Sequence, residues 1–214
     1  GLPAGEAIDL DAVQAQMARR APGQDSASTP RKEADAPQVL SGLLNGITTG
    51  APLCAVIQNT NTHSSDYSNL LAVPRPGHSD YPAWVKYHGY NDIRGGGHFS
   101  GRLTAPLVFA GAVCRQILER KGVVLGAHAL SVGAISDRPL NPEPETLAAL
   151  STAYFPVLDA EKKDAMYREI ETARAAQDSI GGVIECGISG VPAGLGGEGI
   201  FGGVESVFSS ILFG

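Results

Sequence analysis

VIECGISGVPAG, residues 183–194, joins a short β-branched run to a Gly-Val-Pro-Ala-Gly turn. Apolar residues partly alternate over residues 183–188, and this pattern predicts a β-strand. Beyond the turn, apolar side chains recur at the spacing of one helix face: Val204, Val207, Phe208, Ile211 and Leu212. The segment therefore predicts a strand, a tight turn and a helix in succession.

The chain opens on nearly the same turn. Residues 1–5 read Gly-Leu-Pro-Ala-Gly, and a helical pattern follows in which Val13 and Met17 share one face and Asp9 can cap the first turn. A repeat of this kind indicates a duplicated architecture, although two short Gly/Pro turns can also resemble each other by chance. Under duplication a strand precedes the first turn as well, so we expect the chain to be part of a longer polypeptide.

Between the two turns, the sequence alternates between strand-like and helix-like patterns. The segments are a strand at 53–57, a helix at 107–117 with Pro106 ahead of it and Gly122 behind it, a strand at 125–135, a short helix opening at 141–142 and a polar surface helix at 159–177. Residues 24–38 are mostly polar and predict a mobile loop. Since no linker divides residues 1–214, the predicted fold class is a single α+β domain with two strand–Gly-x-Pro-Ala-Gly–helix units.

The composition argues against several classes of protein. The formal net charge of -6 is unlike that of a general nucleic-acid binder. We find no apolar run of the roughly 20 residues that a membrane-spanning helix needs, and no basic-then-apolar leader of the secretory kind. Cys54, Cys114 and Cys186 are far apart in apolar contexts, so we predict reduced core cysteines and a cytoplasmic location.

Residues 75–104 are the densest stretch in chemistry-bearing side chains, with three of the five histidines, three arginines and six glycines. Within them, RGGGHFSGR, residues 94–102, could form an anion-binding nest, because consecutive glycines let backbone N–H groups converge ahead of a helix N-terminus. A flexible turn before the helix is the alternative, since the glycine spacing matches neither common phosphate-binding motif.

His78 is the candidate general acid or base. It follows a Pro-Gly turn and has an arginine and an aspartate close in sequence. The alternative is a loop histidine that caps backbone groups. His63 and His128 lack such neighbours and are assigned to structure. Since the sequence contains no Cys-x-x-Cys or His-x-x-x-His pair, we do not expect a zinc site.

Residues 75–81, RPGHSDY, followed by residues 94–102, resemble the signature of the chorismate synthase family. Further matches agree in order and spacing: residues 19–24, 59–60 with 66–67, 178–182 and 190–196. Each piece is weak alone, but the ordered set is specific and covers essentially all 214 residues.

The resemblance implies an enzyme that converts 5-enolpyruvylshikimate 3-phosphate to chorismate by anti-1,4-elimination of phosphate, the last common step toward the aromatic amino acids. It implies reduced FMN as the cofactor, without net redox change, and NADPH to regenerate it in some members. It also implies a β-α-β sandwich of two similar halves, assembled as a homotetramer. The substrate carries a phosphate and two carboxylates, which a net acidic chain needs a local arginine cluster to hold.

The same resemblance implies roles for individual residues. Three match substrate-binding positions: Arg20, Arg75 and Arg102. His78 matches the second active-site histidine, beside the flavin ring. His98, Phe99 and Ser100 align with a flavin-contacting triplet that is commonly Arg-Ser-Ser, and a second family arginine falls on Ser26. These substitutions change the side-chain contacts, whereas Ser100 and the backbone can persist.

Two parts of the family pattern have no match in residues 1–214. One is the N-terminal Gly-Glu-Ser-His segment that carries the first catalytic histidine, and the other is a flavin-phosphate segment rich in Lys, Thr and Ser. We therefore expect residues 1–214 alone to be inactive. Two other functions stay open at this point: an NAD(P)H-dependent FMN reductase, and a non-catalytic fragment whose glycine loop binds an anion.

Overall fold

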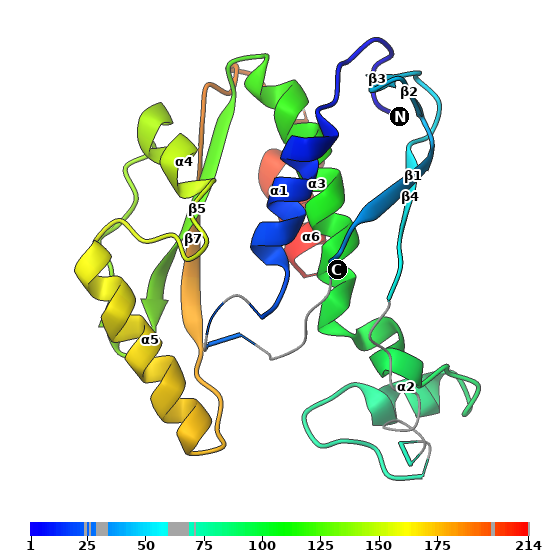
Figure 1. The fold of residues 1–214 in the computed structure, drawn as a ribbon, viewed down its shortest axis with the longest axis vertical. Coiled ribbons are helices and arrows are strands. Elements are labelled where there is room, and N and C mark those ends of the chain that lie inside the picture. The colour runs from blue at the N-terminus through cyan, green and yellow to red at the C-terminus, as the bar shows by residue number, and fades with distance from the viewer. Residues whose placement is uncertain are drawn as a thin grey trace.

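A computed structural model describes residues 1–23, 25, 27–28, 34–59, 69–70, 72–197 and 200–213. They form a mixed fold of helices and sheets (Figure 1). The helices are α1 (Leu10–Arg20), α2 (Asp80–Lys86), α3 (Thr104–Glu119), α4 (Pro144–Leu150), α5 (Ala160–Ala175) and α6 (Val204–Leu212), with 3-10 helices η2 (Arg94–Phe99) and η3 (Gly101–Leu103). The strands are β1 (Pro37–Ser41), β2 (Leu43–Leu44), β3 (Ile47–Thr48), β4 (Cys54–Ile57), β5 (Val124–Val132), β6 (Ile135–Ser136) and β7 (Gly182–Ser189).

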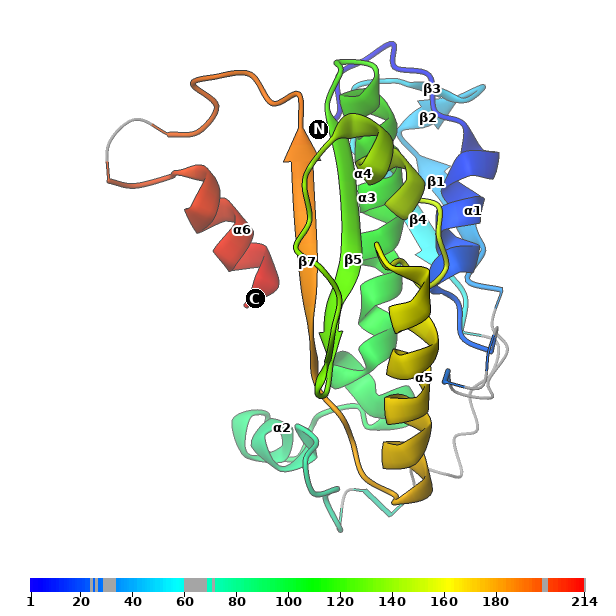
Figure 2. The same cartoon turned by 90° about the vertical axis from the view of Figure 1, so that its left-hand side faces the viewer.

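The elements form layers around two helices. In Figures 1 and 2, α1 and α3 lie between the sheet of β6, β5 and β7 on one side and the β1–β4 pair on the other. Strand β5 pairs antiparallel with β7 from Val124↔Ser189 to Val132↔Gly182. This sheet–helix–sheet order confirms the predicted α+β sandwich.

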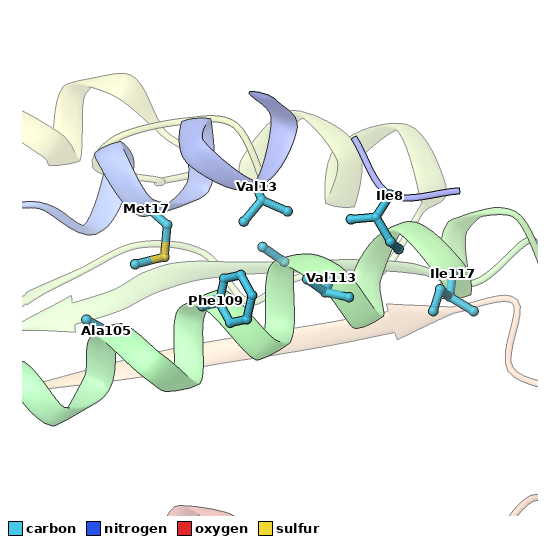
Figure 3. Packing of buried hydrophobic residues seen from close by; sticks show 8 residues of the cluster. Ile8, Val13, Met17, Ala105, Phe109, Val113 and Ile117 are labelled. Atoms are coloured by element: carbon cyan, nitrogen blue, oxygen red, sulfur yellow. The ribbon is translucent and has the colours of Figure 1, made fainter. Parts of the chain in front are cut away.

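The main core lies between α1 and α3. Figure 3 shows Val13 and Met17 of α1 facing Phe109 and Val113 of α3, and Val13 and Met17 are fully buried. Asp9 caps α1, since its Oδ1 accepts hydrogen bonds from the N–H groups of the next turn at 2.9 and 3.1 Å. The predicted helical face is thus confirmed, and its apolar stripe packs on the neighbouring helix.

Both copies of the repeated turn end on a glycine with the same backbone conformation. β7 leads through the second turn to α6, which confirms the predicted strand–turn–helix unit. Gly5 and Gly194 adopt φ of +88° and +86°, and a Cβ on either would meet nothing within 4 Å. Glycine is therefore required here by the left-handed backbone and not by lack of space.

Several element boundaries differ from the sequence prediction; the strand expected at 125–135, for example, is the pair of strands β5 and β6. The short helix α4 begins at Pro144 and not at 141–142, because Glu143 is extended and the proline takes the first helical turn, where its missing N–H costs nothing. The loop predicted over residues 24–38 ends earlier, because β1 starts at Pro37 and pairs with β4. Residues 24, 26 and 29–33 of that loop lie outside the described residues.

The predicted core location of the cysteines is wrong. Cys54, Cys114 and Cys186 are free and exposed. Cys54 of β4 and Cys114 of α3 line one cavity of about 580 Å³, and Cys186 of β7 lines another. The error has a geometric cause: neighbours in sequence point in different directions on a helix or strand, so an apolar context does not place a side chain inside.

Among the described residues, none of the helices has the length and apolar character needed to cross a bilayer.

Candidate functional site

The candidate site residues enter from the chain between β4 and α3 and from the end of α1. α2, η2 and η3 follow one another below α3 and lead directly into its first turn (Figure 1). Ser100 caps η3, since its Oγ accepts from the Arg102 N–H at 3.3 Å, and the Thr104 hydroxyl donates to the Gly101 carbonyl at 2.8 Å. These local bonds fix the direction in which residues 98–104 present their side chains.

Arg75, His78 and Asp80 form one compact cluster. The Asp80 carboxylate lies 2.6 Å from His78 Nδ1 through Oδ1. Arg75 donates Nε to Asp80 Oδ2 at 2.8 Å and a terminal nitrogen to Oδ1 at 3.0 Å, and its backbone N–H also reaches Oδ2 at 3.0 Å. The structure thus brings together two residues that the sequence singled out, Arg75 and His78, through the aspartate noted beside them.

The Asp80 carboxylate is held as an anion by this arrangement. Its side chain is 8% exposed, and the hydrogen bonds from the Arg75 side chain hold its pKa well below the ordinary value, against the opposing effect of burial. The Arg75 backbone N–H and the nearby His78 lower the pKa further. Asp80 therefore stays ionised throughout the physiological pH range.

Arg20 and Arg102 belong to a second group of candidate site residues. Arg20, the last residue of α1, makes an ion pair with the buried Asp35 and donates its Nε to Thr104 Oγ1 at 3.3 Å. Asp35 in turn lines a cavity of about 270 Å³ with Ser100 and Arg102. The cavity wall also includes Gln58, Asn59, Arg94 and the apolar residues Ala55, Ile57 and Phe109.

His98 and Phe99 line a different cavity, of about 240 Å³, on the side of α2. Asp80 and the tyrosines Tyr87 and Tyr90 share this wall. Asn91 also lines it, and its buried Oδ1 has no hydrogen-bond partner in the part of the chain that the structure describes. The wall is thus partly aromatic, with the unpartnered oxygen of Asn91 buried beside it.

The seven candidate residues therefore form two neighbouring groups and do not surround one shared cavity. Ser100 and Arg102 line the first cavity, and Arg20 joins it through Asp35. His98 and Phe99 line the second, which Arg75 and His78 join through Asp80. Gly97 lines both cavities. The turn at Gly97 is therefore the point where the two groups meet.

The glycine run has a defined backbone. Residues 94–99 form the 3-10 helix η2, and Gly97 adopts φ of +60° so close to the chain that an added Cβ would lie 2.5 Å from the Asp92 carbonyl oxygen. Arg94 is engaged with Asp92, its Nε lying 2.9 Å from Oδ1, and these hydrogen bonds lower the pKa of Asp92 to about 2. Of the two arginines at the ends of the run, Arg94 is thus paired with a carboxylate of its own loop.

A larger cavity, of about 430 Å³, is lined by the candidate residue Arg20 and by two further arginines, Arg19 and Arg115, whose contacts are structural. Arg19 donates to the carbonyls of Leu150, Ser151 and Ala153 at 3.3, 3.0 and 2.5 Å. Arg115 donates to the Ser151 hydroxyl at 2.8 Å. These guanidinium groups satisfy the carbonyls at the C-terminal end of α4, so they tie the helix pair to α4.

Sequence reasoning did not assign a role to Asp35, Asp80 or Asn91, whereas Thr104 was expected to be a further donor to an anion. Asp80 had a signal, since it lies two residues after His78, but adjacency alone does not show which residues share hydrogen bonds. Asp35 lies in a polar stretch with no pattern of its own. As for metals, the described residues contain no group of three or more His, Cys, Asp or Glu side chains that could hold an ion.

Comparison with known proteins gives one consistent answer. A family model described as chorismate synthase matches residues 1–214. A chorismate synthase of Thermococcus kodakarensis is 43% identical over 197 residues, covering 92% of this chain and 54% of the relative. One of Dehalococcoides mccartyi is 41% identical over 214 residues, covering 100% of this chain and 58% of the relative.

A solved structure agrees with these relatives. The crystal structure of a chorismate synthase superposes with a TM-score of 0.68 at 26% identity, covering 92% of this chain and 54% of the other. The chain thus spans about half the length of the relatives that it matches. The match of the family model over every residue and the identity of about 40% leave one conclusion: the chain belongs to the chorismate synthase family.

Proposed function

We propose that residues 1–214 carry part of the active site for the anti-1,4-elimination of phosphate from 5-enolpyruvylshikimate 3-phosphate, which gives chorismate. The observation that carries the proposal is the family match over all 214 residues. The arrangement of Ser100 and Arg102 around one cavity supports it, because this is the donor set that a phosphate or carboxylate needs.

Arg102 is the residue we assign to the substrate anion. A guanidinium fork can donate two parallel hydrogen bonds to a phosphate, and it stabilises the charge that grows on the departing group as the C–O bond breaks. Ser100 adds a hydroxyl on the same wall. Arg20 completes the positive field from the end of α1, with its guanidinium held in place by Asp35 and Thr104.

The cavity of His98 and Phe99 fits one edge of a flavin. Phe99, Tyr87 and Tyr90 offer flat surfaces for an aromatic ring. Reduced FMN, when bound, would supply electron density to the allylic system during the elimination. His78, which joins this wall through Asp80, would hold or release a proton beside it.

The remaining parts of the proposal rest on the family likeness. They are NADPH as the reductant that regenerates the flavin, a homotetramer, a cytoplasmic location and a small-molecule substrate as the partner. We also propose that residues 1–214 alone do not turn over substrate. Large apolar side chains of α6, such as Phe208, Ile211 and Leu212, are exposed, and covering by further protein would bury them.

Chorismate formation tests the last point directly. The purified 214-residue chain, supplied with the enolpyruvyl substrate and chemically reduced FMN, is expected to release no phosphate above the rate without protein, because two segments of the family pattern, one with the first catalytic histidine and one for the flavin phosphate, have no match in these residues. The measurement is phosphate release together with chromatographic detection of chorismate. Turnover by the 214-residue chain would contradict this expectation and would support the elimination itself.

Arg102→Ala tests the assignment of the anion site. In a chimera with residues 1–214 replacing the matching part of the Thermococcus kodakarensis relative, Arg102→Ala is expected to lower the rate of phosphate release by about 10²-fold, since one donor to the developing charge is lost. Arg102→Lys keeps the charge but loses the planar fork, so its rate of phosphate release should lie between the rates of the parent and of Arg102→Ala. Arg168→Ala, on the exposed face of α5, is the matched control and should leave the rate unchanged.

The outcomes separate two kinds of failure. A parent chimera that consumes NADPH but releases no phosphate from the substrate would overturn the elimination and favour a flavin reductase. An active parent whose Arg102→Ala variant stays within about twofold of it would leave the elimination standing and remove Arg102 from the anion site.

A further inference from the structure

The cavity of Ser100 and Arg102 has a carboxylate in its wall. Asp35 lines this cavity of about 270 Å³, and it is the one acidic side chain among the described residues of the wall. Its side chain is only 7% exposed. Since like charges repel more strongly where little water screens them, a carboxylate at this place opposes the binding of an anion.

Arg20 is the cation that compensates Asp35. Its Nη1 donates a hydrogen bond to Asp35 Oδ2 within the ion pair, and its Nε donates to Thr104 Oγ1 at 3.3 Å. The Thr104 hydroxyl is fixed in turn, because it donates to the Gly101 carbonyl at 2.8 Å. A guanidinium has five N–H donors, so these two bonds use only part of what Arg20 can offer.

Arg20 and Arg102 differ in their relation to the cavity. Arg102 lines it together with Asp35, whereas Arg20 lines the larger cavity of about 430 Å³ and contacts the smaller one through its bond to Asp35. The Asp35 carboxylate thus stands where an anion in the smaller cavity would approach Arg20. Phosphate can replace it there, because arginine binds phosphate and carboxylate through the same N–H donors.

A second arginine of the same wall is also paired, but the pair is of a different kind. Arg94 makes an ion pair with Asp92 at 2.6 Å, and their side chains are 72% and 55% exposed. Water screens such a pair, so Asp92 has little effect on an anion in the cavity. The buried Asp35 is therefore the carboxylate with the larger influence.

We propose that Asp35 is a positioning residue that competes with the bound anion for the Arg20 guanidinium. Arg20 bonds either to Asp35 or to the anion, and its return to Asp35 favours the release of inorganic phosphate. The release of phosphate as a product rests on the proposed function, whereas the competition for Arg20 does not. Asp35 thus lowers the affinity of the cavity for free phosphate.

Binding of inorganic phosphate to the 214-residue chain tests the competition. Asp35→Asn keeps the size of the side chain and removes its charge. It is expected to lower the Kd for phosphate by about 10-fold, because a like charge leaves the wall and Arg20 becomes available to the anion. Asp35→Glu keeps the charge, so its Kd should stay within about threefold of the native value. Isothermal titration calorimetry at constant ionic strength measures these values.

Asp92→Asn is the matched control, since it makes the same change in the carboxylate partner of another arginine of the wall. Because that pair is exposed, the Kd for phosphate should change by less than about twofold.

A second measurement needs only the native chain. After labelling with ¹⁵N-arginine, the Nε–H signal of Arg20 is identified by its loss in Arg20→Lys. Saturation with phosphate is expected to shift this signal, because the guanidinium exchanges one partner for another.

Three results would overturn the proposal. The first is an Asp35→Asn chain that binds phosphate no more tightly than the native chain, including the case in which neither binds it. The second is an equal gain in Asp92→Asn. The third is a native Arg20 signal that does not move while phosphate binds, which is decisive even if Asp35→Asn does not fold. Failure of the chorismate assay would leave the phosphate results as they stand, so the two proposals fail separately.

Discussion

Replacing His128 with alanine is expected to lower the free energy of unfolding by about 3–5 kcal/mol, because the change removes one partner of a buried ion pair and leaves the other uncompensated. His128 lies on β5, and its side chain is fully buried. Nδ1 is 3.2 Å from Asp137 Oδ2, and Nε2 is 2.9 Å from Glu185 Oε2 on the paired strand β7. Both ring nitrogens therefore face a carboxylate oxygen, and the protonated ring can donate to both.

Backbone groups complete the network around Asp137. The N–H groups of Leu158 and Arg138 donate to it at 2.6 and 2.8 Å. Burial alone would raise the pKa of Asp137, but these N–H groups and His128 outweigh it and lower the pKa. The hydrogen bond from His128 is the largest cause that lowers the pKa of Glu185.

The direction of these shifts fixes the pH dependence. Carboxyl groups whose pKa is lower in the folded chain than in the unfolded one contribute stability that is fully present above their ordinary pKa values of 3.8 and 4.5. This contribution is lost as the pH falls through the folded values. In His128→Ala the two carboxylates lose the cation that faces them, so protonating these carboxylates at low pH removes an unfavourable charge. The loss in free energy of unfolding caused by His128→Ala should therefore be larger at pH 7 than at about pH 4.

Urea unfolding of the 214-residue chain at both pH values measures this. His128→Ala/Glu185→Gln is the matched control: it removes a charge that has lost its partner, its amide oxygen can still accept from the Leu140 N–H, and it should recover part of the stability at pH 7. If His128→Ala lowers the free energy of unfolding by less than about 1 kcal/mol at pH 7, the network stabilises the fold no more than an exposed ion pair does.

Sequence patterns within a single helix or strand were enough to predict that element, whereas contacts between elements were harder to predict. The helical face of α1, the helix α3 and the β7–turn–α6 unit depend on neighbours within a few residues, and all three are confirmed. The face of α3 is only partly as expected, since Val113 and Ile117 are buried but Leu107 and Cys114 are exposed. The β2–β3 hairpin was missed, although Asn45 and Gly46 at its turn both have positive φ and form the Asn-Gly pair that favours such hairpins. This signal was in the sequence.

The candidate site shows what a single sequence cannot contain. The resemblance selected seven residues, but the two groups into which they fall depend on Asp35 and Asp80, whose positions are set by tertiary packing. His128 was correctly assigned to structure, while its partners, 9 and 57 residues away, were not foreseen. The catalytic and binding roles of these residues remain predictions.

Gly190→Ala is expected to lower the free energy of unfolding by about 3–5 kcal/mol, combining a left-handed backbone with a steric clash. Gly190 opens the second repeated turn with φ of +78°, and an added Cβ would lie 2.0 Å from the Gly122 carbonyl oxygen and 2.9 Å from its carbon. Gly122 connects the end of α3 to β5, so neither backbone can move without shifting a strand of the central sheet.

Gly194→Ala and Gly5→Ala are the matched controls for the same turn. Both positions have positive φ but open space around the missing Cβ, so each substitution should cost only the left-handed strain of about 1–2 kcal/mol, and the two costs should agree. Urea unfolding of the three variants separates strain from clash. Equal losses at Gly190 and Gly194 would mean that the close approach of Gly190 to Gly122 can relax. Unequal losses at Gly5 and Gly194 would mean that the surroundings hold the two turns differently, although the turns are alike in sequence and in φ.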